Sequence, residues 1–399
     1  MQQLIDKYAL VYANLVKHDQ AYPTPEYLKS LVKIGNIDFE GEMTKDTEGS
    51  DFIKKILLDD QPGPVYAQIW GGTNTLACAL KSIEHEYKGS SAWKEIYEKV
   101  SEKVIIYTIL DQDATYRKYI ASSWPEIRII YNSAQFWSFA YMWSMAVPRE
   151  LSGYLSGQWF AENIKFKHGP LLESYYLWGD GQKITGDPEH NQGDLQEAKR
   201  QRRNQYDFIS EGDSPAYFFI LDYGLRSTED PSFGGLGGRF VQSASNARRW
   251  EDGAAVIDFD PITGKGETSY PQVRWIPALQ NDFAARADWC VFVFDKANHA
   301  PVLKLNHSKD LVAKPGDSVK LNGSANDPDG DQLKYSWWQY REAGTYNKSI
   351  SVQSKDSKEA LFIVPSDIKT GETIHLIFEV QDSGTPSLTR YQRVIVTVK

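Results

Sequence analysis

Cysteine is almost absent from this 399-residue chain, which holds only Cys78 and Cys290. Two cysteines cannot build a disulfide-stapled scaffold, and they form none of the CxxC pairs that are typical of zinc sites. Both lie in apolar stretches, TLACAL and DWCVFVF. We therefore expect buried free thiols, with one long-range disulfide as the alternative.

Long apolar runs and an excess of positive charge are also missing. No run of apolar residues approaches the roughly 18 that a transmembrane helix needs, so we expect no membrane span. The 44 Lys and Arg residues against 53 Asp and Glu residues give a net charge of −9. This balance argues against a nucleic-acid partner, because phosphate neutralisation needs a cationic face.

Aromatic residues, in contrast, are abundant. They make up 13% of the chain, with 12 Trp and 23 Tyr. Broad aromatic faces suit sugar rings or bases, although most such side chains fill hydrophobic cores. The length of the chain exceeds what one ordinary core holds, so we expect two domains.

The N-terminus has neither the basic segment nor the apolar core of a signal peptide. Its pattern is that of the middle of an amphipathic helix. The residues expected on the core-facing side are Leu4, Tyr8, Val11, Tyr12, Leu15 and Val16. Because a domain rarely opens inside such a helix, we expect the first domain to be incomplete at its N-terminus.

Residues 1–297 alternate helical patterns with short apolar runs, which predicts an open, mostly parallel sheet covered by helices. Strands are expected over 64–70, 104–110 and 127–131. Helices are expected over 51–60, 73–83, 92–103 and 277–288. The polar, charged stretch 185–204 is expected to be a surface excursion.

The pattern becomes all-β in residues 298–399. Short alternating strands separated by turn-forming residues over about a hundred residues are typical of an immunoglobulin-like sandwich. On its expected third strand, LKYSWWQY, one of Trp337 and Trp338 should face the core. Asp327, Asp329 and Asp331 alternate like the start of an EF-hand loop, but a turn is the better interpretation because no Glu follows at the twelfth position.

Ligands of open parallel sheets bind beyond the carboxyl ends of the strands. One candidate there is the Gly-rich turn WGGTNTLA, which begins at Trp70 and includes Asn74. A second is the pair Asp111 and Asp113, which could bind a metal or a sugar hydroxyl but could equally cap the next helix. No GxSxG elbow and no GxGxxG fingerprint is present, which argues against a serine-hydrolase triad and a dinucleotide site.

A resemblance extends along most of the chain. The segments PVYAQIWGGTNTLA, DQD, EGDSPAYFFIL, GGLGGRF and QNDFAARADWC, followed by DPDGDQLKYSWWQY, resemble the bacterial DUF1593 family, also named cellulose-binding protein Sde182. The resemblance implies a nucleoside hydrolase-like α/β domain followed by an immunoglobulin-like domain. Nucleoside hydrolases hold a calcium ion at the carboxyl edge of the sheet, and this ion binds ribose hydroxyls and activates the attacking water.

Carried over to this sequence, the resemblance implies a calcium site formed by the Trp70 backbone carbonyl and Asp282. It also implies sugar contacts from Glu211, Asp213 and Asn281, where Asn281 replaces a His that helps the leaving base. Asn74, Asp111 and Asp113 complete the expected substrate-binding set. The aspartate cluster that ends the first strand of the hydrolases has no counterpart before residue 52, so no catalytic residue is assigned.

Three hypotheses follow. The first is calcium-dependent hydrolysis of N-glycosidic or related glycosyl bonds by the full-length protein, with a carbohydrate or nucleoside-like ligand. The second is binding of cellulose or another polysaccharide without catalysis. The third is an inactive fragment with an incomplete sheet. The full-length parent protein is expected to be exported, either secreted or periplasmic.

Overall fold

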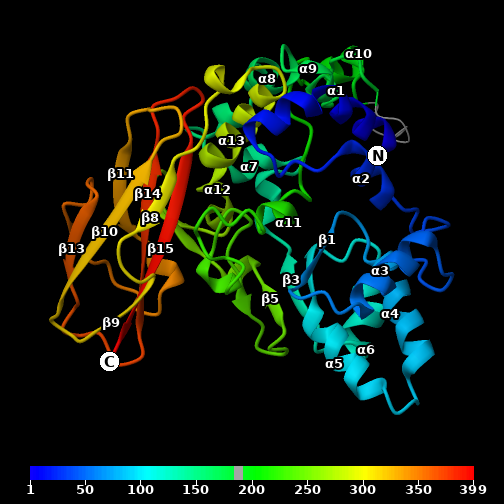
Figure 1. The fold of residues 1–399 in the computed structure, drawn as a ribbon, viewed down its shortest axis with the longest axis horizontal. Helices are drawn as coiled ribbons and strands as arrows, with labels where there is room; N and C mark the ends of the chain where they lie inside the picture. The colour runs from blue at the N-terminus through cyan, green and yellow to red at the C-terminus, as the bar shows by residue number, and fades with distance from the viewer. Residues whose placement is uncertain (184–191) are drawn as a thin grey trace.

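The computed structural model describes residues 1–183 and 192–399. In Figure 1 the helices and the parallel sheet lie to the right, and two stacked β-sheet layers lie to the left. The longer α-helices are α1 (Gln2–His18), α2 (Pro25–Leu31), α3 (Glu48–Leu58), α4 (Asn74–Tyr87), α5 (Trp93–Lys103) and α13 (Ile276–Trp289). The shorter ones are α6 (Ala121–Ser123), α7 (Trp143–Ala146), α8 (Gly157–Phe160), α9 (Gly169–Leu172), α10 (Leu195–Arg200), α11 (Pro215–Phe218) and α12 (Tyr270–Val273).

The first sheet has the strand order β1-β2-β3-β5-β4. Its strands are β1 (Val65–Ile69), β2 (Val104–Ile109), β3 (Arg128–Asn132), β4 (Val241–Gln242) and β5 (Arg249–Glu251). The first four strands in this order are parallel, and β4 is antiparallel to β5. Every residue of β2 is buried, as a strand covered on both faces requires. The predicted mostly parallel sheet is therefore confirmed.

Helices α3, α4 and α5 cover one face of this sheet. A capping box between Thr47 and Ser50 fixes the start of α3. The buried face of α4 packs into a core that also receives β2 and the indole of Trp124. These helices match the predicted ranges to within a few residues, because their apolar periodicity is regular.

Helix α1 is present, but its buried face differs from the prediction. Ile5, Val11 and Leu15 are buried, whereas Leu4 is 46% exposed. Apolar residues at both positions 4 and 5 leave the choice of face to tertiary packing. The helix contacts α9 and α13. The expectation for Leu4 is therefore wrong.

The C-terminal part consists of two four-stranded sheets, ordered β12-β13-β10-β8 and β11-β14-β15-β9. The first contains β8 (Val302–Leu305), β10 (Ser318–Asn326), β12 (Val352–Gln353) and β13 (Glu359–Ile363). The second contains β9 (Asp310–Ala313), β11 (Lys334–Gln339), β14 (Thr373–Gln381) and β15 (Thr389–Val398). The indole of Trp337 is fully buried between the sheets, and Trp338 faces the other way. One of the two tryptophans faces the core, as predicted.

The outer face of the second sheet packs against the α/β part. Tyr340, Ile377 and Tyr391 share one buried core with Trp275. A two-stranded ribbon of β6 (Asp258–Asp260) and β7 (Lys265–Glu267) lies at this junction. There the Asp258 carboxylate accepts hydrogen bonds from the Tyr340 hydroxyl, at 2.6 Å, and from Arg239, at 2.7 Å.

Three further expectations concern single features. Cys78 and Cys290 are buried free thiols, as predicted. No helix in the described part of the chain is long and apolar enough to cross a membrane. Of the surface excursion expected at 185–204, residues 184–191 lie outside the described residues, and Lys199 and Arg200 in the remainder are exposed.

Candidate functional site

The turn after β1 brings an indole to the carboxyl edge of the sheet. Trp70 follows β1 directly, and its side chain is 58% exposed. Gly71 has a φ of +119°, which L side chains rarely adopt. A Cβ on Gly72 would lie only 2.1 Å from Oδ2 of Asp113. The two glycines are therefore needed for the close approach between this turn and the loop after β2.

The two acids after β2 act as helix caps. Asp113 accepts hydrogen bonds from the backbone N–H of Asn74 at 2.9 Å and from the backbone N–H and hydroxyl of Thr115 at 3.0 and 2.7 Å. Asp111 accepts from the backbone N–H groups of Tyr116 and Arg117, both at 3.1 Å. The capping alternative raised from the sequence thus describes their contacts.

Asn74 is engaged in a similar way, because its side-chain amide donates to the backbone carbonyl of Asn36 at 2.8 Å. These contacts do not test the substrate-binding role predicted for Asn74, Asp111 and Asp113, which stays a prediction. Asp111 and Asp113 each accept three hydrogen bonds within the protein, whereas the Asn74 side chain makes one.

Glu211 and Asp213 differ from these caps. The side-chain amide of Gln112, in the loop after β2, donates to Oδ1 of Asp213 at 3.2 Å. Burial raises the pKa of Asp213, which this hydrogen bond only partly offsets. Burial also raises the pKa of Glu211, whose carboxylate accepts from the Tyr175 hydroxyl. The structure thus brings Asp213 to the loop after β2, at the edge where ligands of such sheets bind.

Exposed aromatic side chains lie on other segments at this edge of the sheet. Trp137, 38% exposed, lies in the 3-10 helix after β3, where the neighbouring Phe136 packs against Gly212. Tyr217, 45% exposed, lies on α11, which begins two residues after Asp213 and contacts β1 and β2. We call Trp70, Gln112, Trp137, Asp213 and Tyr217 the carboxyl-edge site. Gln112, Trp137 and Tyr217 were missed from the sequence, although Trp137 lies in a stretch, residues 135–160, that is rich in Trp, Phe and Tyr.

Asn281 and Asp282 lie instead on α13, where they face the second sheet of the C-terminal part. Asn281 donates to the backbone carbonyl of Ser387 at 2.8 Å. Asp282 accepts from Arg390 and Arg286, both at 2.7 Å, and from the Tyr223 hydroxyl at 2.6 Å. Burial acts to raise the pKa of Asp282, but the two guanidinium groups outweigh it and hold the pKa below its usual range.

These contacts do not fit a calcium ion at Asp282. A calcium ion takes six to eight oxygen ligands, and two arginines bound to the same carboxylate would repel it. Within residues 1–183 and 192–399, the one group of three acidic or other ligating side chains with suitable spacing is Asp327, Asp329 and Asp331. Asp282 is not part of it, so we derive no step through a metal ion.

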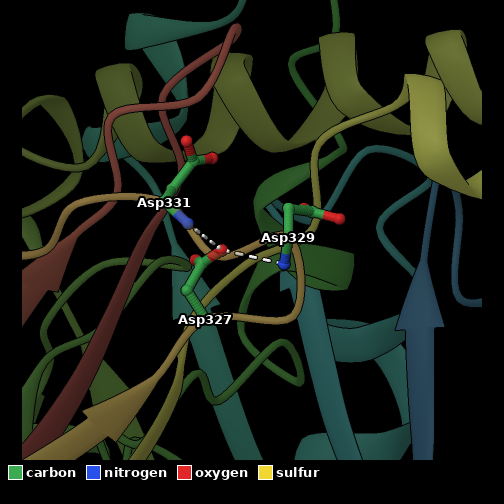
Figure 2. Close-up of side chains that lie close together, drawn as sticks. All are labelled: Asp327, Asp329 and Asp331. Atoms are coloured by element: carbon green, nitrogen blue, oxygen red, sulfur yellow. Dashed lines mark hydrogen bonds between the residues drawn. The ribbon is translucent and has the colours of Figure 1, made fainter.

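These three aspartates lie in a turn. Figure 2 shows the Asp327 carboxylate accepting hydrogen bonds from the backbone N–H groups of Asp329 and Asp331, both at 3.0 Å. The Asp329 carboxylate points away and binds the backbone N–H of His299 at 2.6 Å. The arrangement agrees with the turn preferred from the sequence over an EF-hand-like calcium loop.

Comparisons with known proteins agree with this architecture. Residues 1–240 match the family model "Cellulose-binding Sde182, nucleoside hydrolase-like domain", and residues 318–398 match "Cellulose-binding protein Sde0182, C-terminal domain". A nucleoside hydrolase-related hypothetical protein from Saccharophagus degradans, described as associated with carbohydrate metabolism, has 27% sequence identity and a TM-score of 0.76. The match covers 99% of this chain and 87% of that one.

Other solved structures match only a part of the chain. Three N-terminal domains of the outer capsid protein Hoc of bacteriophage RB49 match with 8% identity over 25% of this chain and 30% of that one, at a TM-score of 0.19. The human desmocollin-1 ectodomain matches with 21% identity over 27% of this chain and 21% of that one, at a TM-score of 0.18. No curated protein matches the chain.

Proposed function

Because the chain belongs to the Sde182 family of cellulose-binding proteins with a nucleoside hydrolase-like domain, we propose that it binds polysaccharide chains at the carboxyl-edge site, without a metal ion. The observation that supports this most is that the exposed Trp70 indole and the Asp213 carboxyl group both lie at the carboxyl edge of the parallel sheet. A sugar offers an apolar ring face and a rim of hydroxyl groups, and this site has a counterpart for each.

The aromatic side chains supply the apolar counterpart. Trp70, Trp137 and Tyr217 are too exposed to serve the core. Broad rings of this kind bury a large area on contact at little cost in side-chain entropy. A flat pyranose ring laid on the Trp70 indole would gain this area while its equatorial hydroxyl groups stay at the rim.

The polar counterpart is Asp213 with Gln112. The carboxylate has room for more acceptor contacts than the one from Gln112, and the Gln112 amide adds a further acceptor oxygen. Sugar hydroxyl groups can donate to both. The net charge of −9 argues against a phosphate-rich ligand as the main partner but does not oppose a neutral glucan.

This proposal predicts that Trp70→Ala and Asp213→Asn each weaken the binding of cellotetraose at this site about tenfold, because either stacking area or a hydroxyl acceptor is lost. Titration calorimetry measures the affinity. Tyr27→Ala is the matched control, since Tyr27 is 58% exposed on α2 and lies outside the site. Unchanged affinity in both site variants would refute the proposal.

A second candidate function is hydrolysis of a glycosyl bond at the same edge. It is favoured by the raised pKa values of Glu211 and Asp213, since a raised pKa widens the pH range over which a carboxyl group holds a proton that it can donate to a leaving group. Release of reducing sugar should then fall as the pH rises through the raised pKa, and Glu211→Gln or Asp213→Asn should abolish it. Absence of release from both cello-oligosaccharides and nucleosides, with binding retained, would leave binding alone as the function.

The polysaccharide ligand also bears on location. Cellulose is an insoluble polymer outside the cell, so a protein that binds it has to be exported. We therefore infer a secreted or periplasmic parent protein, which fractionation of the producing cells with an antibody to this chain would test.

A further inference from the structure

Two hollows meet at the junction between the α/β part and the C-terminal sheets. The first, of about 410 Å³, is lined on one side by Phe259 and on the other by Gln339 and Glu342. The second, of about 330 Å³, is lined by Tyr270 and Gln381 among others. Both volumes are of the size that small-molecule sites have. The hollows share two lining residues, Arg274 and Trp338.

Trp338 owes this position to the alternation of side chains along β11. Trp337 points into the sandwich core, so its neighbour must point out of it. The Trp338 indole N–H donates to Oε2 of Glu379 at 2.9 Å, and the Arg274 guanidinium lies 5.4 Å from the ring centroid. The half-buried indole is therefore held in one orientation between the two hollows.

Arg274 is fixed in turn by aromatic and acidic neighbours. Its guanidinium lies 4.3 Å from the Tyr340 ring centroid and 4.8 Å from that of Tyr270, and it forms an ion pair with Asp258 at 3.3 Å. Such stacking leaves the rim of the planar guanidinium able to donate hydrogen bonds. Arg274 and Trp338, which line both hollows, are thus held in place before any ligand binds.

The second hollow also offers unused hydrogen-bonding groups. The Trp275 side chain lines this hollow but is only 2% exposed, so it contributes to the wall. Glu379 adds an acceptor whose pKa burial raises, and Gln381 adds an amide at the rim.

We propose that the two hollows form one groove that binds a β-linked glucan chain, with a sugar ring stacked on Trp338 and hydroxyl groups bound by Glu379 and Gln381. The inference rests on the proposed polysaccharide binding, and it gives the protein a second, independent binding site for the same class of polysaccharide. A planar indole between donors and acceptors on both sides matches a flat sugar ring, which carries hydroxyl groups along both edges.

The test is calorimetric titration of the whole chain with cellotetraose. Wild-type protein should bind two molecules, and Trp338→Ala should bind one. Because Trp338 also packs at the junction, Gln381→Ala is the second variant, expected to bind two molecules with the affinity of one lowered at least fivefold. Gln353→Ala, at an exposed glutamine of the other sheet, is the matched control and should behave as wild type.

The outcomes separate this inference from the proposed carboxyl-edge site. If Trp338→Ala and Gln381→Ala keep wild-type stoichiometry and affinities, the groove is not a binding site. If Trp70→Ala has no effect while Trp338→Ala abolishes all binding, the groove stands and the carboxyl-edge site falls. Absence of cellotetraose binding by the wild-type chain overturns both.

Discussion

Replacing Asp258 with asparagine is expected to lower the free energy of unfolding by about 3–5 kcal/mol, the cost of removing one partner from a buried ion pair. Asp258 is fully buried. It accepts from Arg239 at 2.7 and 2.9 Å and from Arg274 at 3.3 Å. The Tyr340 hydroxyl donates a further hydrogen bond to it from the other part of the chain.

The effect is large because the positive charges of Arg239 and Arg274 would lose their negatively charged partner. Asparagine has nearly the shape of aspartate but no charge, so two arginine side chains would remain at the junction without their counter-ion. The cost of such an unpaired buried charge exceeds the cost of a lost neutral hydrogen bond. Because Tyr340 belongs to the C-terminal part, the loss should also weaken the contact between the two parts.

Urea unfolding measures this effect as a shift in midpoint at unchanged slope. The matched control is Asp38→Asn, because Asp38 pairs with Lys45 at 3.1 Å with both side chains exposed. An exposed pair of this kind contributes about 0–1 kcal/mol. Equal destabilisation by the two variants would contradict the role of Asp258 as the anchor of the junction.

Asp282→Asn is the second substitution with a large expected effect, again about 3–5 kcal/mol, because Arg286 and Arg390 would lose their shared carboxylate. The two arginines come from different parts of the chain, Arg286 from α13 and Arg390 from β15. Asp282 therefore ties the helix to the second sheet, and its removal should loosen both.

The pH dependence of this contribution has a definite sign. The pKa of Asp282 is lowered in the folded protein. Its stabilisation is thus fully present above the ordinary Asp pKa and disappears as the pH falls through the lowered value. The difference in unfolding free energy between wild type and Asp282→Asn should shrink from pH 6 toward strongly acidic pH. A difference that grows on acidification would contradict the ion-pair role.

The sequence predicted the parallel sheet well, for a physical reason. β2 is a continuous apolar run that is buried on both faces, and such strands are typical of parallel sheets covered by helices. The face of α1 was less certain, since Leu4 and Ile5 fit the helical period almost equally. The positions of Asp111 and Asp113 at a strand end were evident from the chain order, whereas the contact of Asp113 with Asn74 depends on the turn after β1.

Contacts between distant segments could not be predicted. Asp282 meets Arg390 across 108 residues, and no local pattern encodes this pairing. The resemblance alone implied a calcium ligand at Asp282, where the fold provides two guanidinium groups. Likewise, alternation along β11 required one tryptophan inside and one outside, but only the register against β14 assigns Trp337 to the core.

The most direct test of polysaccharide binding without a metal is titration of cellotetraose into the wild-type chain in EDTA and in millimolar calcium, with Asp213→Asn as the variant. We expect the same affinity in both buffers and an approximately tenfold weaker carboxyl-edge site in the variant. Binding that appears only with calcium, and that Asp213→Asn leaves intact, would contradict the account.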